Sequence, residues 1–185
     1  MLKRRSLILG APAAIFATEV YGQSRDVGRS VGPALMSAVN SLPGVSEGHG
    51  RGTLTILFAP WCHVSPTLYG VTRGFLTEIG LRWVPFSGGH PEGRIGTERI
   101  LASGSASALG RNFIPAGSQP TISQPTPLSD AQDQRMQQVE RVVVSETGQP
   151  MSTPTLVYMR FDGRYRAILG GVDANDLRSI ADVIG

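Results

Sequence analysis

An apolar run, an amphipathic stretch and a second apolar run follow one another in the first half of the chain. Residues 53–59, "TLTILFA", are almost all β-branched or apolar, which predicts a strand buried on both faces. Apolar residues then recur at helical spacing over residues 64–79, which predicts a helix that ends at Gly80. Residues 81–87, "LRWVPFS", predict a second strand. Strand, helix and strand in so short a segment indicate the βαβ unit of a parallel sheet.

The middle of the chain has weaker patterns. Thr97 is expected to cap a helix formed by "ERILASGSASALG". Residues 111–128 contain several prolines and little periodicity, which predicts an irregular surface segment. Ser129 with Gln132 three residues later forms a capping box, which predicts a helix through "DAQDQRMQQVERVVVSET" that Gly148 ends.

The last part of the chain predicts a hairpin and a closing helix. Residues 153–160 and 164–171 alternate between apolar and polar positions, and Asp162 with Gly163 between them is a strong hairpin turn signal. Asp173 is expected to cap an amphipathic helix over "NDLRSIADVIG". The predicted order is β-α-β, a helical insertion, and then β-β-α, which defines an α/β fold.

The segment at residues 23–52 is rich in glycine, serine and charge. One apolar pattern, "GPALMSAVNSLPG", has helical spacing between two prolines, so we expect a short helix and a linker here.

Residues 1–22 have the pattern of an export signal. "MLKRR" is a charged start, "SLILGAPAAIFA" an apolar segment, and small residues precede Gln23. We therefore expect export to the periplasm, by the Sec route or, because Arg4 and Arg5 are adjacent, by the twin-arginine route. An uncleaved membrane anchor is disfavoured because the apolar stretch is shorter than the ~20 residues of a membrane span.

The charge balance changes once this signal is set aside. The whole chain has 17 Lys and Arg against 14 Asp and Glu, a net charge of +3. Three of those cations and one of those acids lie in residues 1–22, so the remainder is close to neutral. This balance does not predict nucleic-acid binding. The histidines show no metal-ligand spacing either, and we expect neither a metal site nor a cofactor.

The chain contains a single cysteine, Cys62, which follows Trp61 at the start of the predicted helix. A thiolate at a helix amino terminus faces unpaired N–H groups and the positive end of the helix dipole, and both lower its pKa. His63 adds positive charge if protonated, and Trp61 shields one side of the sulfur. Ser65 stands where a redox-active dithiol motif has its second cysteine. A lone cysteine after an apolar strand also fits a buried small hydrophobe without chemistry.

Three segments together resemble the thioredoxin superfamily. "FAPWCHVS" is similar to its F-x-x-x-W-C-x-x-C line, "STPTLVY" to its Thr-Pro strand with a cis-proline, and "FDGRYRAILGGVDANDL" to its hairpin and closing helix. The resemblance implies a thioredoxin-like fold over residues 53–185, a central mixed sheet with flanking helices. A helical insertion at about 92–148 precedes the cis-Pro strand, as in the catalytic domain of bacterial periplasmic disulfide isomerases (DsbC/DsbG type). The chain departs from the pattern of those isomerases in two places. Ser65 replaces the second cysteine, and the segment before residue 53 is too short for their dimerisation domain.

The resemblance also implies a site. Its expected members are the catalytic Cys62, the neighbours Trp61, His63 and Ser65, and the substrate-groove pair Thr153 and Pro154, joined by a cis peptide bond. One thiol can form a mixed disulfide but cannot clear it alone. We therefore expect isomerase-like or reductase-like exchange on cysteine-containing envelope proteins, with an external small thiol or redox partner that frees Cys62. The alternative is a non-catalytic chaperone or assembly module of an envelope secretion or conjugation system.

Overall fold

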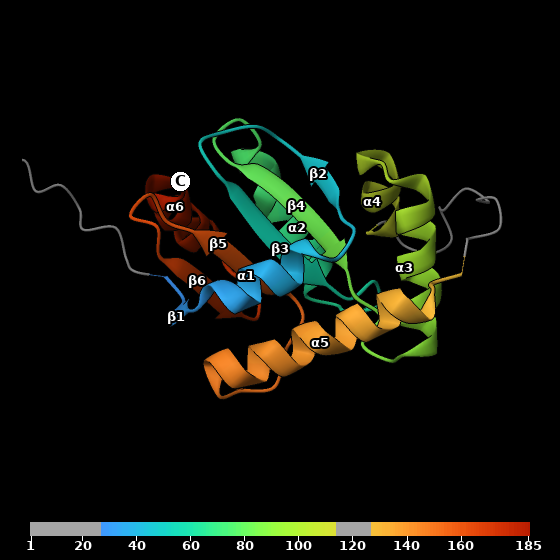
Figure 1. Cartoon of the computed structure of the whole chain (residues 1–185). Coiled ribbons are helices and arrows are strands. Elements are labelled where there is room, and N and C mark those ends of the chain that lie inside the picture. Colours follow the sequence, from blue (N-terminus) through green and yellow to red (C-terminus); the bar gives the residue numbers. More distant parts are fainter. Residues whose placement is uncertain (1–26, 114–126) are drawn as a thin grey trace, which may run out of the picture.

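One mixed sheet forms the centre of the structure, a computed structural model that describes residues 27–113 and 127–185 (Figure 1). Its strand order is β1-β6-β5-β3-β4-β2. The strands are β1 (Arg29–Val31), β2 (Val45–Glu47), β3 (Thr53–Phe58), β4 (Gly80–Pro85), β5 (Thr155–Met159) and β6 (Tyr165–Leu169). The central pair β3 and β4 is parallel, and the other neighbouring strands are antiparallel.

Helices cover both faces of this sheet. They are α1 (Pro33–Asn40), α2 (Ser65–Thr72), α3 (Pro91–Ser103), α4 (Ala106–Asn112), α5 (Asp130–Thr147) and α6 (Ala174–Val183), with a 3-10 turn at Arg73–Phe75. Apolar residues of α1 and α5 pack on one face, and those of α2, α3, α4 and α6 pack on the other. Strand β3 serves both cores, because Ile56 and Phe58 belong to one and Leu57 to the other. This explains why its sequence is continuously apolar.

Most of the elements expected downstream of residue 128 are present as predicted. Ser129 and Gln132 form the capping box of α5, and Gly148 ends that helix in the left-handed conformation. Asp173 caps α6. Strands β5 and β6 pair antiparallel on either side of the turn at Asp162 and Gly163.

The prediction of a linker around the first helix is wrong. Helix α1 is present, but β1 and β2 on either side of it are edge strands of the sheet. Strand β1 pairs with β6, and β2 pairs with β4. Each has only three residues, too few for an alternating pattern to be visible in the sequence.

Two helix boundaries also differ from the prediction. Helix α2 ends at Thr72 and continues as the short 3-10 turn, and Gly80 begins β4 instead of ending a helix. Helix α3 begins at Pro91, so Thr97 lies inside it and is buried, not at its start. Proline at the first helical position accounts for the earlier start, because it has no N–H to leave unpaired.

Residues 1–22, the expected export signal, lie outside the described residues, as does most of the irregular segment at 111–128. Among the residues that are described, no helix is both long enough and apolar enough to cross a bilayer.

Candidate active site

Cys62 lies in the tight loop between the end of β3 and the start of α2. Its N–H donates to the Ala59 carbonyl (3.0 Å), and its own carbonyl accepts from the N–H of Ser65 (3.3 Å). The helix begins at Ser65, so the sulfur precedes the first helical turn instead of lying within it. Only 8% of the Cys62 surface is exposed. The loop therefore fixes the sulfur at the amino-terminal end of α2, as the sequence predicted.

The strand that follows the helical insertion brings Thr153 to the sulfur. The Cys62 thiol donates a hydrogen bond to the Thr153 carbonyl, with 3.1 Å between Sγ and O. The Thr153–Pro154 peptide bond is cis, the isomer that the resemblance implied. Pro154 is buried just ahead of β5, the antiparallel neighbour of β3. Cys62 and Thr153, which are 91 positions apart in the chain, thus meet at one end of the sheet.

Ser65 occupies the place of the missing second cysteine and is completely buried. Its hydroxyl has no geometrically good hydrogen-bond partner among the described residues. A buried hydroxyl without a hydrogen-bond partner destabilises the folded state. A hydrogen bond from this hydroxyl to a negatively charged acceptor nearby is therefore strongly favourable. The Cys62 sulfur is such an acceptor when it is deprotonated, and Ser65 acts to lower its pKa.

The pKa of the Cys62 thiol is lower than its ordinary value. Burial by itself raises this pKa, but donors that stabilise the thiolate lower it and prevail: the Val64 backbone, the Thr153 side chain, and the hydroxyl and backbone of Ser65. The thiolate is therefore favoured more than in a free cysteine. Since the thiolate is the nucleophile in disulfide exchange, a lowered pKa favours reactivity of this sulfur.

Trp61 and His63 flank the sulfur on the surface. Trp61 is 48% exposed, and its ring lies 5.2 Å from the ring of His90, between centroids. His63 is exposed and makes no hydrogen bond or ion pair with the described part of the chain. Both residues adjoin Cys62 in the chain, and both are exposed.

Helix α3 contributes to the site in a way that the sequence reading missed. A Cβ atom at Gly93 would lie 2.6 Å from Trp61 Nε1, and one at Gly96 would lie 2.5 Å from Pro60 Cβ. Two glycines at helical spacing thus allow α3 to pack directly on the loop before Cys62. The only sequence signal was the pair itself, "GRIG", inside a helix where glycine is unfavourable.

Within residues 27–113 and 127–185, no three His, Cys, Asp or Glu side chains lie close enough together to hold a metal ion. His49, at the far end of the sheet near Gly80, is remote from Cys62.

Sheet order, flanking helices and the position of Cys62 define a thioredoxin-like fold. The structure is similar to ScsC from Proteus mirabilis (TM-score 0.55, 14% identity, 83% of this chain and 80% of that one). It is also similar to a disulfide interchange protein from Neisseria gonorrhoeae (TM-score 0.52, 17% identity, 76% and 94%). A third similar structure is a periplasmic thioredoxin-like protein from Salmonella enterica serovar Typhimurium (TM-score 0.54, 11% identity, 83% and 97%).

At these identities the likeness establishes the fold. No protein-family profile matches the chain, and no curated protein matches it significantly.

Proposed function

We propose that this chain is an exported, monothiol thioredoxin-fold protein that exchanges disulfides with cysteine-containing envelope proteins through Cys62. The observation that carries the proposal is the setting of the sulfur. It lies at the start of α2, its pKa is lowered, and it contacts the cis-Pro loop at Thr153. An incidental core cysteine has no need of these features.

The chemistry available to one thiol follows from the position of Ser65. The Cys62 thiolate attacks a client disulfide, one client sulfur becomes bonded to Cys62, and the other leaves as a thiolate. Ser65 cannot attack this new bond. The freed client thiolate can attack a different sulfur of the client and release Cys62, which is isomerisation. An external small thiol can also release it, which completes a reduction.

The loop at Thr153, just ahead of β5, gives a client a place to bind. Because β5 is already paired with β3 and β6, the client segment would pair with the loop backbone at Thr153, ahead of β5, and present its sulfur to Cys62, a form of β-strand addition. Trp61 and His63 cover the neighbouring surface. The chemistry requires no cofactor.

The similar structures support this proposal at a general level. Their descriptions name a disulfide interchange protein and a periplasmic thioredoxin-like protein. We infer that this chain also functions in the periplasm and that residues 1–22 are its export signal. We further infer a closer relation to the DsbC/DsbG-type catalytic domain.

Refolding of a client with scrambled disulfides tests the proposal. We expect the wild-type protein with millimolar glutathione to accelerate recovery of activity of scrambled ribonuclease, and Cys62→Ala to fall to the rate of glutathione alone. Ser46→Ala, an exposed serine on β2, serves as the matched control and should behave as wild type. Equal acceleration by wild type and Cys62→Ala would overturn the redox proposal and leave the chaperone or assembly alternative.

A further inference from the structure

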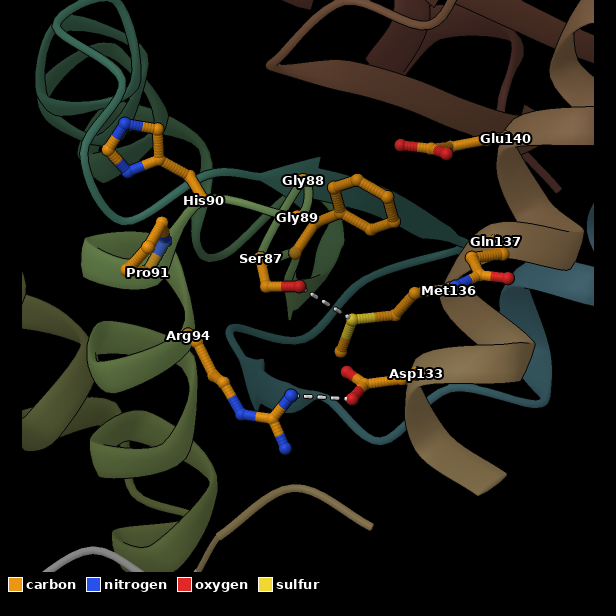
Figure 2. Close-up of a pocket in the computed structure, with 11 residues that line it drawn as sticks. Ser87, Gly88, Gly89, His90, Pro91, Arg94, Asp133, Met136, Gln137 and Glu140 are labelled. Atoms are coloured by element: carbon orange, nitrogen blue, oxygen red, sulfur yellow. Dashed lines mark hydrogen bonds and ion pairs between the residues drawn. The ribbon is translucent and has the colours of Figure 1, made fainter. Parts of the chain in front are cut away.

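A pocket of about 480 Å³ lies beside the loop that carries the reactive cysteine. The turn after β4 and the start of α3 form one side of it, and one face of α5 forms the other (Figure 2). Gly88, Gly89 and His90 belong to the first side. Met136, Gln137 and Glu140 belong to the second.

The charges in this pocket are unbalanced toward the negative. Arg94 is held by Asp133 (Nη1 to Oδ2, 2.6 Å) and by the buried Glu98 (Nε to Oε1, 3.2 Å), and it also donates to the Leu128 carbonyl. Its single positive charge is therefore shared between two carboxylates. Glu140 makes no hydrogen bond or ion pair with any residue that the structure describes, and it lies on the same face of α5 as Asp133 in Figure 2.

The remaining wall is largely apolar. Phe86 and Met136 are buried, with 3% exposure each, and the hydroxyl of Ser87 donates to the Met136 sulfur at 3.5 Å. An apolar wall that leads to an unpaired carboxylate suits a long side chain with an aliphatic stem and a positive end. Lysine and arginine are the side chains with that construction.

Trp61, the residue before Cys62, lies next to this pocket. A Cβ built on Gly88 would lie 3.7 Å from Trp61 Cζ2, and the Trp61 and His90 rings lie 5.2 Å apart. Gly88 and His90 line the pocket, and Trp61 directly precedes the reactive residue. A client chain whose sulfur reaches Cys62 can therefore place a nearby side chain across Trp61 and into the pocket.

We propose that this pocket binds a lysine or arginine side chain of the client close to the cysteine that Cys62 attacks, with Glu140 as its ion-pair partner. The proposal rests on the proposed exchange function and specifies its substrate class: polypeptides with basic residues beside the reacting cysteine.

Peptides with an activated cysteine test the proposal. Each carries its cysteine as a mixed disulfide with nitrothiobenzoate. When the Cys62 thiolate bonds to the peptide sulfur, nitrothiobenzoate leaves as a coloured thiolate. In separate peptides, arginine, norleucine or glutamate is placed at each position on either side of the cysteine. The rates are measured at a mildly alkaline pH. We expect at least one position where the arginine peptide reacts about fivefold to tenfold faster than the norleucine peptide, and the glutamate peptide slowest.

The variant that removes the carboxylate is Glu140→Gln, which should abolish this preference. Asp182→Asn is the matched control, because it changes the net charge equally at an exposed position near Arg51, before β3, and should retain the preference. Equal rates for arginine and norleucine peptides at every position would overturn the proposal. So would a preference that persists in Glu140→Gln.

A direct binding measurement separates this proposal from the exchange function. Peptides with serine in place of cysteine are titrated calorimetrically into the Cys62→Ala chain. Weaker binding of the arginine peptide after the additional Glu140→Gln change supports the pocket even if Cys62 proves unreactive. Unchanged binding would overturn the pocket, whatever the reactivity of Cys62.

Discussion

Replacing Ser65 by cysteine is expected to give the chain the ability to release its own clients. In the wild-type protein, a peptide bound to Cys62 as a mixed disulfide should remain bound until an external thiol is added. In the variant, the introduced thiol attacks the Cys62 sulfur, an internal disulfide forms, and the peptide leaves as a thiol. Because the attacking group is held in place, release should be at least ~10²-fold faster than with millimolar external thiol.

The measurement is the rate of peptide release from a purified mixed disulfide, with no thiol added. Ser46→Cys is the matched control, since it adds a thiol on the exposed edge strand β2, at a position where the structure shows no contact with Cys62. It should leave the mixed disulfide intact. A folded Ser65→Cys variant that retains its peptide as long as wild type would mean that the geometry around Cys62 does not support resolution.

Replacing Gly93 by alanine is expected to destabilise the protein and to disturb the loop that carries Cys62. The new Cβ would lie 2.4 Å from the Ser87 carbonyl oxygen and 2.6 Å from Trp61 Nε1, both closer than such atoms approach. The carbonyl belongs to the backbone and cannot turn aside, so α3 must move away from the loop. Such overpacking costs about 1–3 kcal/mol of unfolding free energy.

Chemical denaturation measures the stability change, and acrylamide quenching of tryptophan fluorescence measures the exposure of Trp61, since the other tryptophan, Trp83, is fully buried. Gly70→Ala in α2 is the matched control. A Cβ there meets no atom within 4 Å, and alanine favours a helix over glycine by ~1 kcal/mol, so stability should stay the same or rise. Equal behaviour of the two variants would contradict the close packing of α3 on the loop.

The elements that the sequence predicted well are those whose signal is local. The capping box of α5, formed by Ser129 and Gln132, lies within one helical turn and is recognisable without the rest of the chain. The continuous apolar run of β3 reports burial on both faces in the same direct way. The hairpin turn at Asp162 and Gly163 is likewise contained in a few residues.

The elements that the sequence missed depend on partners far away. Strand β1 has only three residues, two of them exposed, and it is defined by pairing with β6 more than a hundred residues later. Ile79 continued the helical spacing of α2 and is indeed buried, but it reaches the core from a turn after the helix has ended. Gly93 precedes the helix expected after Thr97, whereas in the structure it lies inside α3 and lets that helix approach Trp61.

The candidate site also has a part that the sequence predicted and a part that it did not. Cys62, Ser65 and the pair Thr153 and Pro154 were recognisable because their motifs and order along the chain match a known pattern. The pocket beside Trp61 was not, because Glu140 reads as an ordinary polar position on an amphipathic helix. Only the tertiary packing of α5 places it opposite the turn after β4.

The pH dependence of Cys62 alkylation by iodoacetamide tests the central claim most directly. Because the lowered pKa leaves a thiolate at pH values where a free thiol is still protonated, the midpoint of the rate profile should lie below that of free cysteine. Ser65→Ala should move the midpoint upward, since it removes a hydroxyl that lowers the pKa. Ser152→Ala, at an exposed position just before Thr153, should not move it. A wild-type midpoint at or above that of free cysteine would contradict the account of Cys62 as an activated nucleophile.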